Sequence, residues 1–482
     1  MDLRDVELDN ESGKLIFAWL LFAVSTLVFA GLFAVLLALS RTPVIQELYQ
    51  GKNFVRVALV GHVDLSVVIW FLAFMGVLWV LSSTSFLKAK LFCPILGWTG
   101  LWVTVGGSIL LTIATILALG EPIFSNYVPV LTHPVFYVSL LLIGLGIGLT
   151  VINTLLTVII AGKPLGLPVL TFGMTAAGIA VIIGLLCFGI AYFLIPKEIA
   201  PGISFDPGLY FERLFWGGGH ILQFANTIGM VTAWLLLAYL TLKNVPIGSD
   251  RMATLAFAVY ILFMLPAPFI FFQTDINSQT HKDSFTHLMK YGLGPSTAFF
   301  AVGIIRGMVK QKKEGGFNWA DPAFSSLVLS MSLFVLGGAV SLFIRGSNLK
   351  IPSHYHGVIG AVTTAFMGLT YYIIPLLGRK VWSQKMAKYQ PYLYATGQAL
   401  FVLGMFWAGA HGVPRKTYGT AQNLNSFAKT AGMVLQGVGG LIAVIGGASF
   451  VLNVLSSLLG KKTQRKDKAK TIRRFHRFRT YP

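Results

Sequence analysis

The sequence predicts an all-α, polytopic membrane protein. Of its 482 residues, 55% are hydrophobic and only 11% are charged, and the mean hydropathy is +0.74. A soluble protein of this length does not need so much apolar sequence. Apolar runs of about 20 residues or more, the length that crosses a bilayer as a helix, recur along the whole chain. The loops between them are short, so no separate soluble domain fits among them.

Twelve apolar runs are expected to span the membrane. They cover residues 15–39, 56–82, 95–119, 134–161, 167–195, 213–242, 252–273, 294–310, 322–344, 355–377, 391–411 and 429–459. Residues 15–460 are therefore expected to form one twelve-helix transmembrane domain. A polar, acidic segment precedes it at residues 1–14, and a basic tail follows it at residues 461–482.

The basic loops predict the orientation in the membrane. They follow the even-numbered spans and contain Lys88, Lys163, Lys243, Lys310 and Arg379. Because positively charged loops stay on the cytoplasmic side, we expect these loops and the C-terminal tail there. The acidic N-terminal segment falls on the same side and is an exception. The net charge of +20 lies largely in these loops and the tail, which fits anionic membrane lipid and does not indicate a nucleic-acid partner.

Eight of the nine histidines fall in one layer of the predicted bundle, in the outer part of the membrane. They are His62, His133, His220, His281, His287, His354, His356 and His411. An isolated pair such as His354 and His356 is typical of a membrane interface. A whole layer of histidines favours cofactor binding instead, because neutral imidazole is the common protein ligand of haem iron and copper.

His354 and His356 are two residues apart at the start of the tenth span. On an α-helix they lie about 200° apart around the axis, so they face opposite sides and are poorly placed to share one metal. They are suited to two different cofactors. The two cysteines, Cys93 and Cys187, form no haem-attachment or cysteine metal motif, so any metal must be held by histidine or carboxylate.

Two stretches resemble the catalytic subunit of the haem–copper oxidase superfamily, which includes respiratory oxygen reductases and nitric oxide reductases. The tenth span, HYHGVIGAVTTAFMGLTYYIIPLLGR, is similar to the family's His-x-His helix with its Pro-x-x-Gly-Arg end. Residues 412–418, GVPRKTY, are similar to the family's Met-Pro-Arg-Arg segment, whose cations hold haem propionates. The resemblance implies that role for Arg415 and Lys416, with Lys416 acting as a point charge where the family has a planar guanidinium.

The resemblance also implies the haem ligands. His354 would be the proximal ligand of a high-spin haem, which is left open to substrate on its other face. His356 would ligate a low-spin haem, and His62 would be the other axial ligand of that haem. Two histidines fill both axial positions, so the low-spin haem would only carry electrons.

The second metal of the active site is expected near Trp216-Gly-Gly-Gly-His220, which resembles the family's Trp-x-x-Gly-His segment. Many oxygen reductases carry a tyrosine four residues after this histidine, and Phe224 stands there in this chain. We expect His220, His281 and His287 to bind the metal, with copper favoured over iron.

The segment after the seventh span lacks the family's adjacent pair of histidines. Asp283 is expected to be a carboxylate ligand or a neighbour of the ligands, since it shares a helix face with His287. The alternative is that Asp275 and Asp283 are ordinary loop acids. Tyr291 is a candidate to replace the missing phenol, as some oxygen reductases carry their tyrosine on the seventh helix.

Three functions are compared. The first is a nitric oxide reductase of the divergent sNOR type without proton pumping, favoured by Phe224, by the altered ligand segment and by spans nearly free of acidic residues apart from Asp64. The second is cytochrome c oxidase-type reduction of O₂. The third is a twelve-span transporter, which does not explain the His-x-His and GVPRK motifs.

The resemblance implies electron entry from a partner. We expect a second subunit with a cupredoxin-like or cytochrome c domain on the outer side, and a soluble cytochrome c or cupredoxin as donor. The expected location is the bacterial inner membrane.

Overall fold

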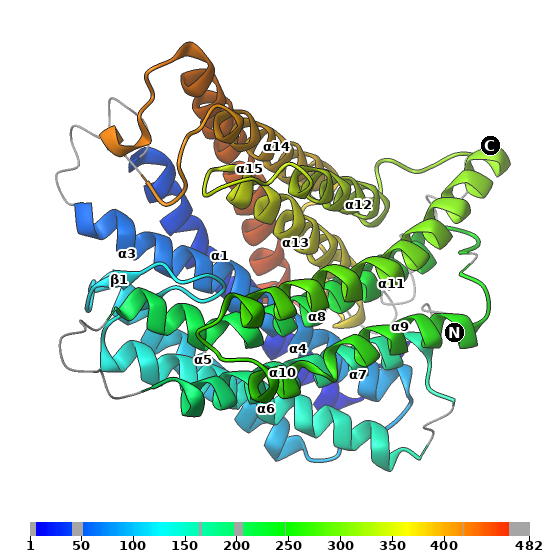
Figure 1. Ribbon diagram of the computed structural model, residues 1–482. Coiled ribbons are helices and arrows are strands. Elements are labelled where there is room, and N and C mark those ends of the chain that lie inside the picture. The colour runs from blue at the N-terminus through cyan, green and yellow to red at the C-terminus, as the bar shows by residue number, and fades with distance from the viewer. Residues whose placement is uncertain are drawn as a thin grey trace. The chain divides into compact units, whose positions relative to one another are not determined.

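The computed structural model describes residues 6–40, 52–162, 166–196, 206–245, 247–417 and 419–461, and these residues are almost entirely helical (Figure 1). The α-helices are α1 (Asn10–Ser40), α3 (Lys52–Val63), α4 (Trp70–Leu81), α5 (Pro94–Ile116), α6 (Pro134–Ile160), α7 (Val169–Leu194), α8 (Pro207–Thr241), α9 (Asp250–Met264), α10 (Ala267–Gln273), α11 (Gln279–Glu314), α12 (Pro322–Ser341), α13 (Lys350–Leu376), α14 (Gln384–Ala410) and α15 (Phe427–Leu459). Strands β1 (Pro122–Ile123) and β2 (Val130–Leu131) form a short antiparallel pair.

The predicted fold class is confirmed. Within the described ranges, 12 helical segments are long and apolar enough to cross a membrane. Two of them are interrupted. The second span continues from α3 through the π-helical segments η2 (Asp64–Ile69) and η3 (Ser82–Phe86) on either side of α4, and the seventh span breaks between α9 and α10 at Pro266. Proline has no amide hydrogen to donate to the preceding turn, which explains the break.

One predicted boundary is wrong. The eighth span was expected at residues 294–310, but α11 begins at Gln279, so the expected loop after the seventh span is largely helix. Residues 279–293 are mostly polar and therefore lack the continuous apolar run of a membrane span. They form a helix that buries only a narrow stripe containing His281, Phe285 and Gly292.

The chain divides into two compact units. Unit 1 comprises residues 1–23, 63–235 and 244–310, and unit 2 comprises residues 24–62, 236–243 and 311–482. Of the predicted terminal segments, residues 1–5 and 462–482 lie outside the described residues, as does Lys163 in the predicted basic loops. Residues 10–14 of the N-terminal segment already belong to α1.

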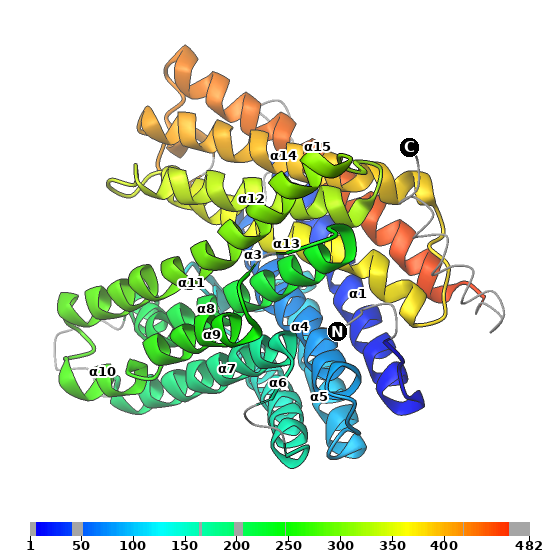
Figure 2. The same cartoon turned by 90° about the vertical axis from the view of Figure 1, so that its right-hand side faces the viewer.

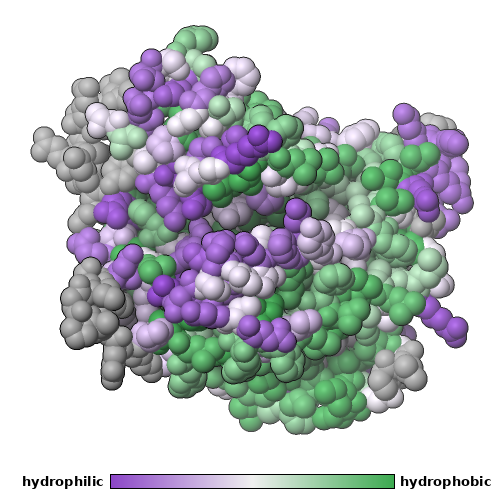
Figure 3. Space-filling view, in the orientation of Figure 1, coloured by the Kyte–Doolittle hydropathy of each residue, from purple (hydrophilic) through white to green (hydrophobic). Residues whose placement is uncertain are grey.

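In unit 1, α5 packs against α6, and α4 to α7 run beside one another (Figure 2). A Cβ atom at Gly100 or Gly146 would meet the facing helix, so the two backbones approach closely at these glycines. Thr104 and Ser108 donate their hydroxyl groups to carbonyls of their own helix, at 2.8 Å each. The polar groups at the contact are thus satisfied locally. The outward faces of α5 and α6 are apolar, as a lipid-facing surface requires (Figure 3).

In unit 2, α12 to α15 pack together, with α14 and α15 in closest contact (Figure 1). Glycines at seven-residue intervals on α15 allow this approach. A Cβ at Gly439 would meet the backbone of α14 at Phe401, and a Cβ at Gly446 would meet the backbone at Tyr394. Small residues at helix contacts are the usual means of close packing in membranes, where no hydrophobic effect drives one helix onto another.

We predict that Gly439→Leu destabilises unit 2, because the added side chain meets the α14 backbone rather than a side chain that can move. The expected loss in unfolding free energy is about 1–3 kcal/mol, measured as a lower thermal unfolding midpoint in detergent. Gly437→Leu is the matched control on the same helix, since a Cβ there meets nothing within 4 Å. Equal midpoints for the two variants would contradict the close approach.

Candidate haem and metal sites

His354 on α13 is oriented by a carbonyl of α12. Its Nδ1–H donates to the carbonyl oxygen of Gly337 at 2.8 Å. The bond depends on a close helix contact, because a Cβ at Gly357 would come within 2.5 Å of the Gly337 Cα. With Nδ1 as the donor, Nε2 carries the lone pair of the neutral ring, which is the form that ligates a metal.

His356 points in a different direction. Its ring centroid lies 4.6 Å from that of Phe401 on α14, whereas His354 faces α12. The two imidazoles therefore point toward different neighbouring helices, as their two-residue spacing predicts. This arrangement suits two separate cofactors.

His62 is held in the same way as His354. It is half-buried near the end of α3, and its Nδ1–H donates to the carbonyl oxygen of Ala30 on α1 at 2.9 Å. The bond again makes Nε2 the acceptor nitrogen, so the tautomer suits an axial haem ligand.

The cationic loop at residues 412–417 is attached to the beginning of α13. Asn348 and Pro414 form a β-bridge, and the Leu349 amide donates to the Val413 carbonyl at 3.1 Å. Arg415 donates from Nε to Ser347 Oγ at 3.1 Å, and Lys416 is exposed. Both cations thus lie within unit 2 close to the start of the helix that carries His354, which fits the predicted binding of haem carboxylates.

In unit 1, His220 is buried on α8, with 2% of its surface exposed. Its Nδ1–H donates to the carbonyl oxygen of Trp216 at 2.7 Å. In the neutral ring Nε2 is then an acceptor, and it lies 3.0 Å from the hydroxyl oxygen of Tyr127, which donates to it.

Three glycines before His220 make room for aromatic rings. A Cβ at Gly217 would meet Phe271 and Phe285, a Cβ at Gly218 would meet Phe188, and a Cβ at Gly219 would meet Tyr127. The Gly-Gly-Gly sequence thus has a steric reason. It lets aromatic rings pack closely against α8 in the turn before the buried His220.

His281 lies in the first turn of α11 and is 1% exposed. The Thr274 hydroxyl donates to the Ile270 carbonyl at 2.7 Å, so it accepts from the Nδ1–H of His281, at 2.9 Å. The Nε2 atom is buried and has no hydrogen-bond partner among the described residues. A buried lone pair without a partner is costly, and a metal ion would satisfy it.

Phe285 lies near both His220 and His281. The ring centroid of Phe285 is 6.3 Å from that of His220 and 5.1 Å from that of His281. The structure therefore brings two of the three predicted metal ligands into one buried aromatic region of unit 1.

The other predicted residues of this segment lie elsewhere. His287 and Asp283 are exposed, and Tyr291 is 57% exposed. Asp283 accepts from Gln279 Nε2 at 2.8 Å, and the ring centroid of His287 lies 5.9 Å from that of Tyr291, with the two rings tilted against each other. The structure does not bring these three side chains to His220 and His281. In the described part of the chain, no group of three or more His, Cys, Asp or Glu side chains is placed to share a metal ion.

Two further residues singled out in the sequence are buried. Phe224 is fully buried in unit 1, and its ring packs edge-on to Tyr260, with centroids 6.5 Å apart. Asp64 is also fully buried, and its carboxylate oxygens have no hydrogen-bond partner among the described residues. It lies in a π-helical segment, a feature often found at functional sites.

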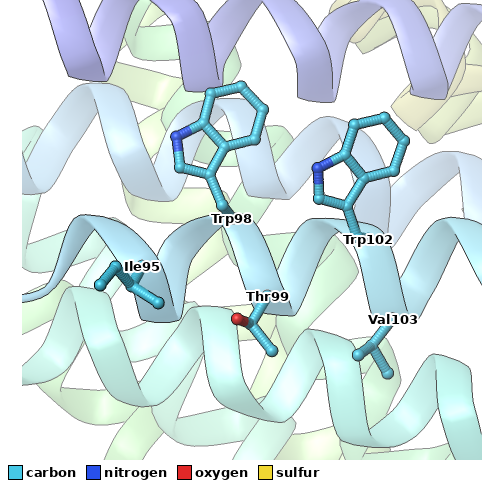
Figure 4. Close-up of a pocket in the computed structure, with 5 residues that line it drawn as sticks. All are labelled: Ile95, Trp98, Thr99, Trp102 and Val103. Carbon is cyan, nitrogen blue, oxygen red and sulfur yellow. The ribbon is translucent and has the colours of Figure 1, made fainter.

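A surface pocket of about 480 Å³ lies on α5, a helix that carries none of these histidines. It is lined by Ile95, Trp98, Thr99, Trp102 and Val103 (Figure 4). The two indoles project from the same side of the helix. The lining has no titratable or metal-binding side chain, so this pocket is not a candidate redox site.

Tyr127 is the residue that the sequence analysis missed. It lies in the loop between β1 and β2, where no motif marks it. The glycines at 217–219 could have predicted a neighbour such as Tyr127, because three glycines before a histidine indicate that bulky side chains pack against the helix there.

The donor set fits the groups implied by the resemblance. His62, His354 and His220 have Nδ1 bonded to a backbone carbonyl, and the His281 Nδ1 is bonded to a hydroxyl. These bonds keep the imidazoles in one neutral tautomer, which is the state that binds haem iron or copper. At His220 the Tyr127 hydroxyl occupies Nε2, so a metal would have to displace this hydroxyl.

Comparisons with known proteins relate the chain to one family. A family model described as Cytochrome C and Quinol oxidase polypeptide I matches residues 14–442. An uncharacterized protein of Rickettsia prowazekii is 29% identical over 504 residues, covering 92% of this chain and 95% of the relative. Cytochrome c oxidase subunit 1 of Thermus thermophilus is 27% identical over 300 residues, covering 56% of this chain and 52% of that protein.

The fold is also shared with a solved structure, described as a cryo-EM structure of a heme-copper terminal oxidase dimer. The TM-score is 0.78 and the sequence identity 21%, over 95% of this chain and 86% of the other. With the family model matching most of its length, the chain belongs to the cytochrome c and quinol oxidase polypeptide I family, the catalytic subunit I of the haem–copper oxidases.

Proposed function

We propose that this protein is the catalytic subunit of a terminal reductase that reduces two NO molecules to N₂O and water with two electrons and two protons. Membership of the family makes it a membrane oxidoreductase. The observation that carries the proposal of a metal-dependent reaction is the pair of buried imidazoles, His220 and His281, with the unpartnered Nε2 of His281 between aromatic rings.

The proposed haem ligands lie in unit 2, and the proposed ligands of the second metal lie in unit 1. His62 and His356 ligate the low-spin haem, and His354 ligates the high-spin haem, with Arg415 and Lys416 binding propionates. His220 and His281 hold the second metal, for which copper is favoured over iron because the two placed ligands are imidazoles. When bound, the haems and the second metal would supply the electrons and the open coordination positions that the oxidant needs.

NO is favoured as substrate because residue 224 has no phenol and the phenol at position 291 is largely exposed. Residue 224 is a buried phenylalanine that packs against Tyr260, and Tyr291 is largely exposed. O–O cleavage in this family uses a phenol as a source of an electron and a proton, whereas NO reduction breaks no O–O bond. Reduction of O₂ is the second candidate, favoured by the phenol of Tyr127 at 3.0 Å from His220 and by the name of the Thermus thermophilus relative.

The proposed setting is the bacterial inner membrane, with the C-terminus in the cytoplasm. No cysteine-based electron-entry motif occurs in the chain. Electrons are therefore proposed to enter from a second subunit with a cupredoxin-like or cytochrome c domain on the outer side.

Turnover of the purified complex decides between the two substrates. We predict one N₂O formed for every two NO consumed, with slower consumption of O₂ under the same electron donor. Metal analysis should find two haem irons and one further metal per chain. Rapid reduction of O₂ without formation of N₂O from NO would establish the second candidate instead.

Substitution of the two histidines of α13 should separate the two haems. His354→Ala should abolish the carbon monoxide difference spectrum of the high-spin haem and retain the low-spin bands, while His356→Ala should remove the low-spin bands. His411→Ala is the control, because His411 is exposed at the end of α14 and bonds to its own helix at Trp407. Loss of the same haem in both variants would contradict the opposed assignment.

Metal content tests the second site. His220→Ala and His281→Ala should each lower the affinity for the second metal by at least roughly 10-fold, since even the loss of a supporting partner has that effect. His287→Ala shows whether His287 joins them. Unchanged metal content in His281→Ala would remove His281 from the ligand set.

A further inference from the structure

We propose that Thr274 is a positioning residue for His281, and that its hydroxyl oxygen accepts the Nδ1–H of the imidazole so that Nε2 keeps the lone pair for a metal. This inference rests on the function proposed above, which assigns His281 to the second metal. Thr274 caps the C-terminal end of α10, where the seventh span ends, and no motif in the sequence gives it a role.

The direction of the hydrogen bonds selects the tautomer of His281. A threonine hydroxyl has one hydrogen, and that of Thr274 is donated to the Ile270 carbonyl at 2.7 Å. The hydroxyl oxygen is therefore the acceptor in its 2.9 Å contact with His281 Nδ1. With the proton on Nδ1, the neutral ring has its lone pair on Nε2.

The Nε2 atom of His281 is open to a metal. It is buried and has no hydrogen-bond partner among the described residues. His220 differs in this respect, because the Tyr127 hydroxyl lies 3.0 Å from its Nε2. A supporting group on Nδ1 with Nε2 left open is the arrangement that orients a metal-binding histidine. Thr274 stands in this relation to His281.

The turn between Thr274 and His281 is fixed by its own hydrogen bonds. The His281 amide donates to the Ser278 hydroxyl at 3.1 Å, and this hydroxyl donates to the Asp275 carbonyl at 2.7 Å. The Asn277 amide donates to the Asp275 carboxylate at 2.9 Å. Ser278 directly precedes α11, where a serine that accepts from the third residue of the helix is a typical N-cap. The turn thus holds the threonine and the histidine at one separation.

Aromatic rings limit what could replace the Thr274 hydroxyl. The ring centroids of Phe271 and Phe285 lie 4.9 Å and 5.1 Å from that of His281, and each ring is T-shaped against the imidazole. Both rings and the imidazole are buried. Loss of the hydroxyl would therefore leave a buried Nδ1–H without its acceptor, which is more costly than losing an exposed hydrogen bond.

Thr274→Val tests the proposal, because valine has nearly the same shape and removes the hydroxyl. Copper is added to the metal-depleted complex, and its affinity is measured by competition with a chelator. We expect roughly 10- to 100-fold weaker binding, the usual effect of losing the hydrogen-bond partner of a ligating histidine. The infrared band of carbon monoxide photolysed onto the bound copper should broaden or shift. Both haem spectra should match the wild type, which shows that the variant is folded.

Thr274→Ser is the conservative variant, which keeps the hydroxyl and should bind copper as the wild type does. Thr286→Val is the matched control on α11, since the half-buried Thr286 donates its hydroxyl to the Lys282 carbonyl of its own helix. The positioning role is refuted if Thr274→Val binds copper as tightly as Thr286→Val, or if Thr274→Ser is weakened as much as Thr274→Val. Failure of the proposed function would look different, because the wild-type complex itself would then bind no copper or turn over neither NO nor O₂.

Discussion

Close contact of helix backbones at glycine is the constraint on which the candidate sites depend. The contact between Gly337 and Gly357 brings a carbonyl of α12 within hydrogen-bonding distance of His354. Gly219 makes room for the ring that bonds to His220. In each case a missing Cβ lets a partner from a distant part of the chain reach the imidazole.

The second requirement is that polar groups in an apolar surrounding be satisfied. One of the two ring nitrogens is satisfied in each of four histidines, because Nδ1–H donates to a backbone carbonyl or a hydroxyl. These histidines are His62, His220, His281 and His354. It also selects a single neutral tautomer, because the other nitrogen must then be the acceptor. The same bonds that make a histidine tolerable inside a membrane therefore prepare it as a metal ligand.

The residues after the seventh span illustrate where reasoning from sequence succeeds and fails. His281, Asp283, His287 and Tyr291 were considered together because they are close in sequence. On α11 they divide between two faces, with His281 buried and the other three exposed. Proximity in sequence does not show which face of a helix is buried, since a polar segment carries too weak an apolar pattern to indicate it.

The sequence by itself determined the membrane class, the twelve spans and the opposed directions of His354 and His356, because hydropathy and helical period are local properties. The family motifs also predicted haem ligands from short stretches of the chain, and these assignments remain predictions. Only the tertiary structure placed Phe285 beside both His220 and His281, and joined His220 to the phenol of Tyr127. Tyr127 is 93 positions from His220, and their contact depends on a fastened loop and a glycine gap. Such a contact is a property of packing between distant segments, and no local pattern encodes it.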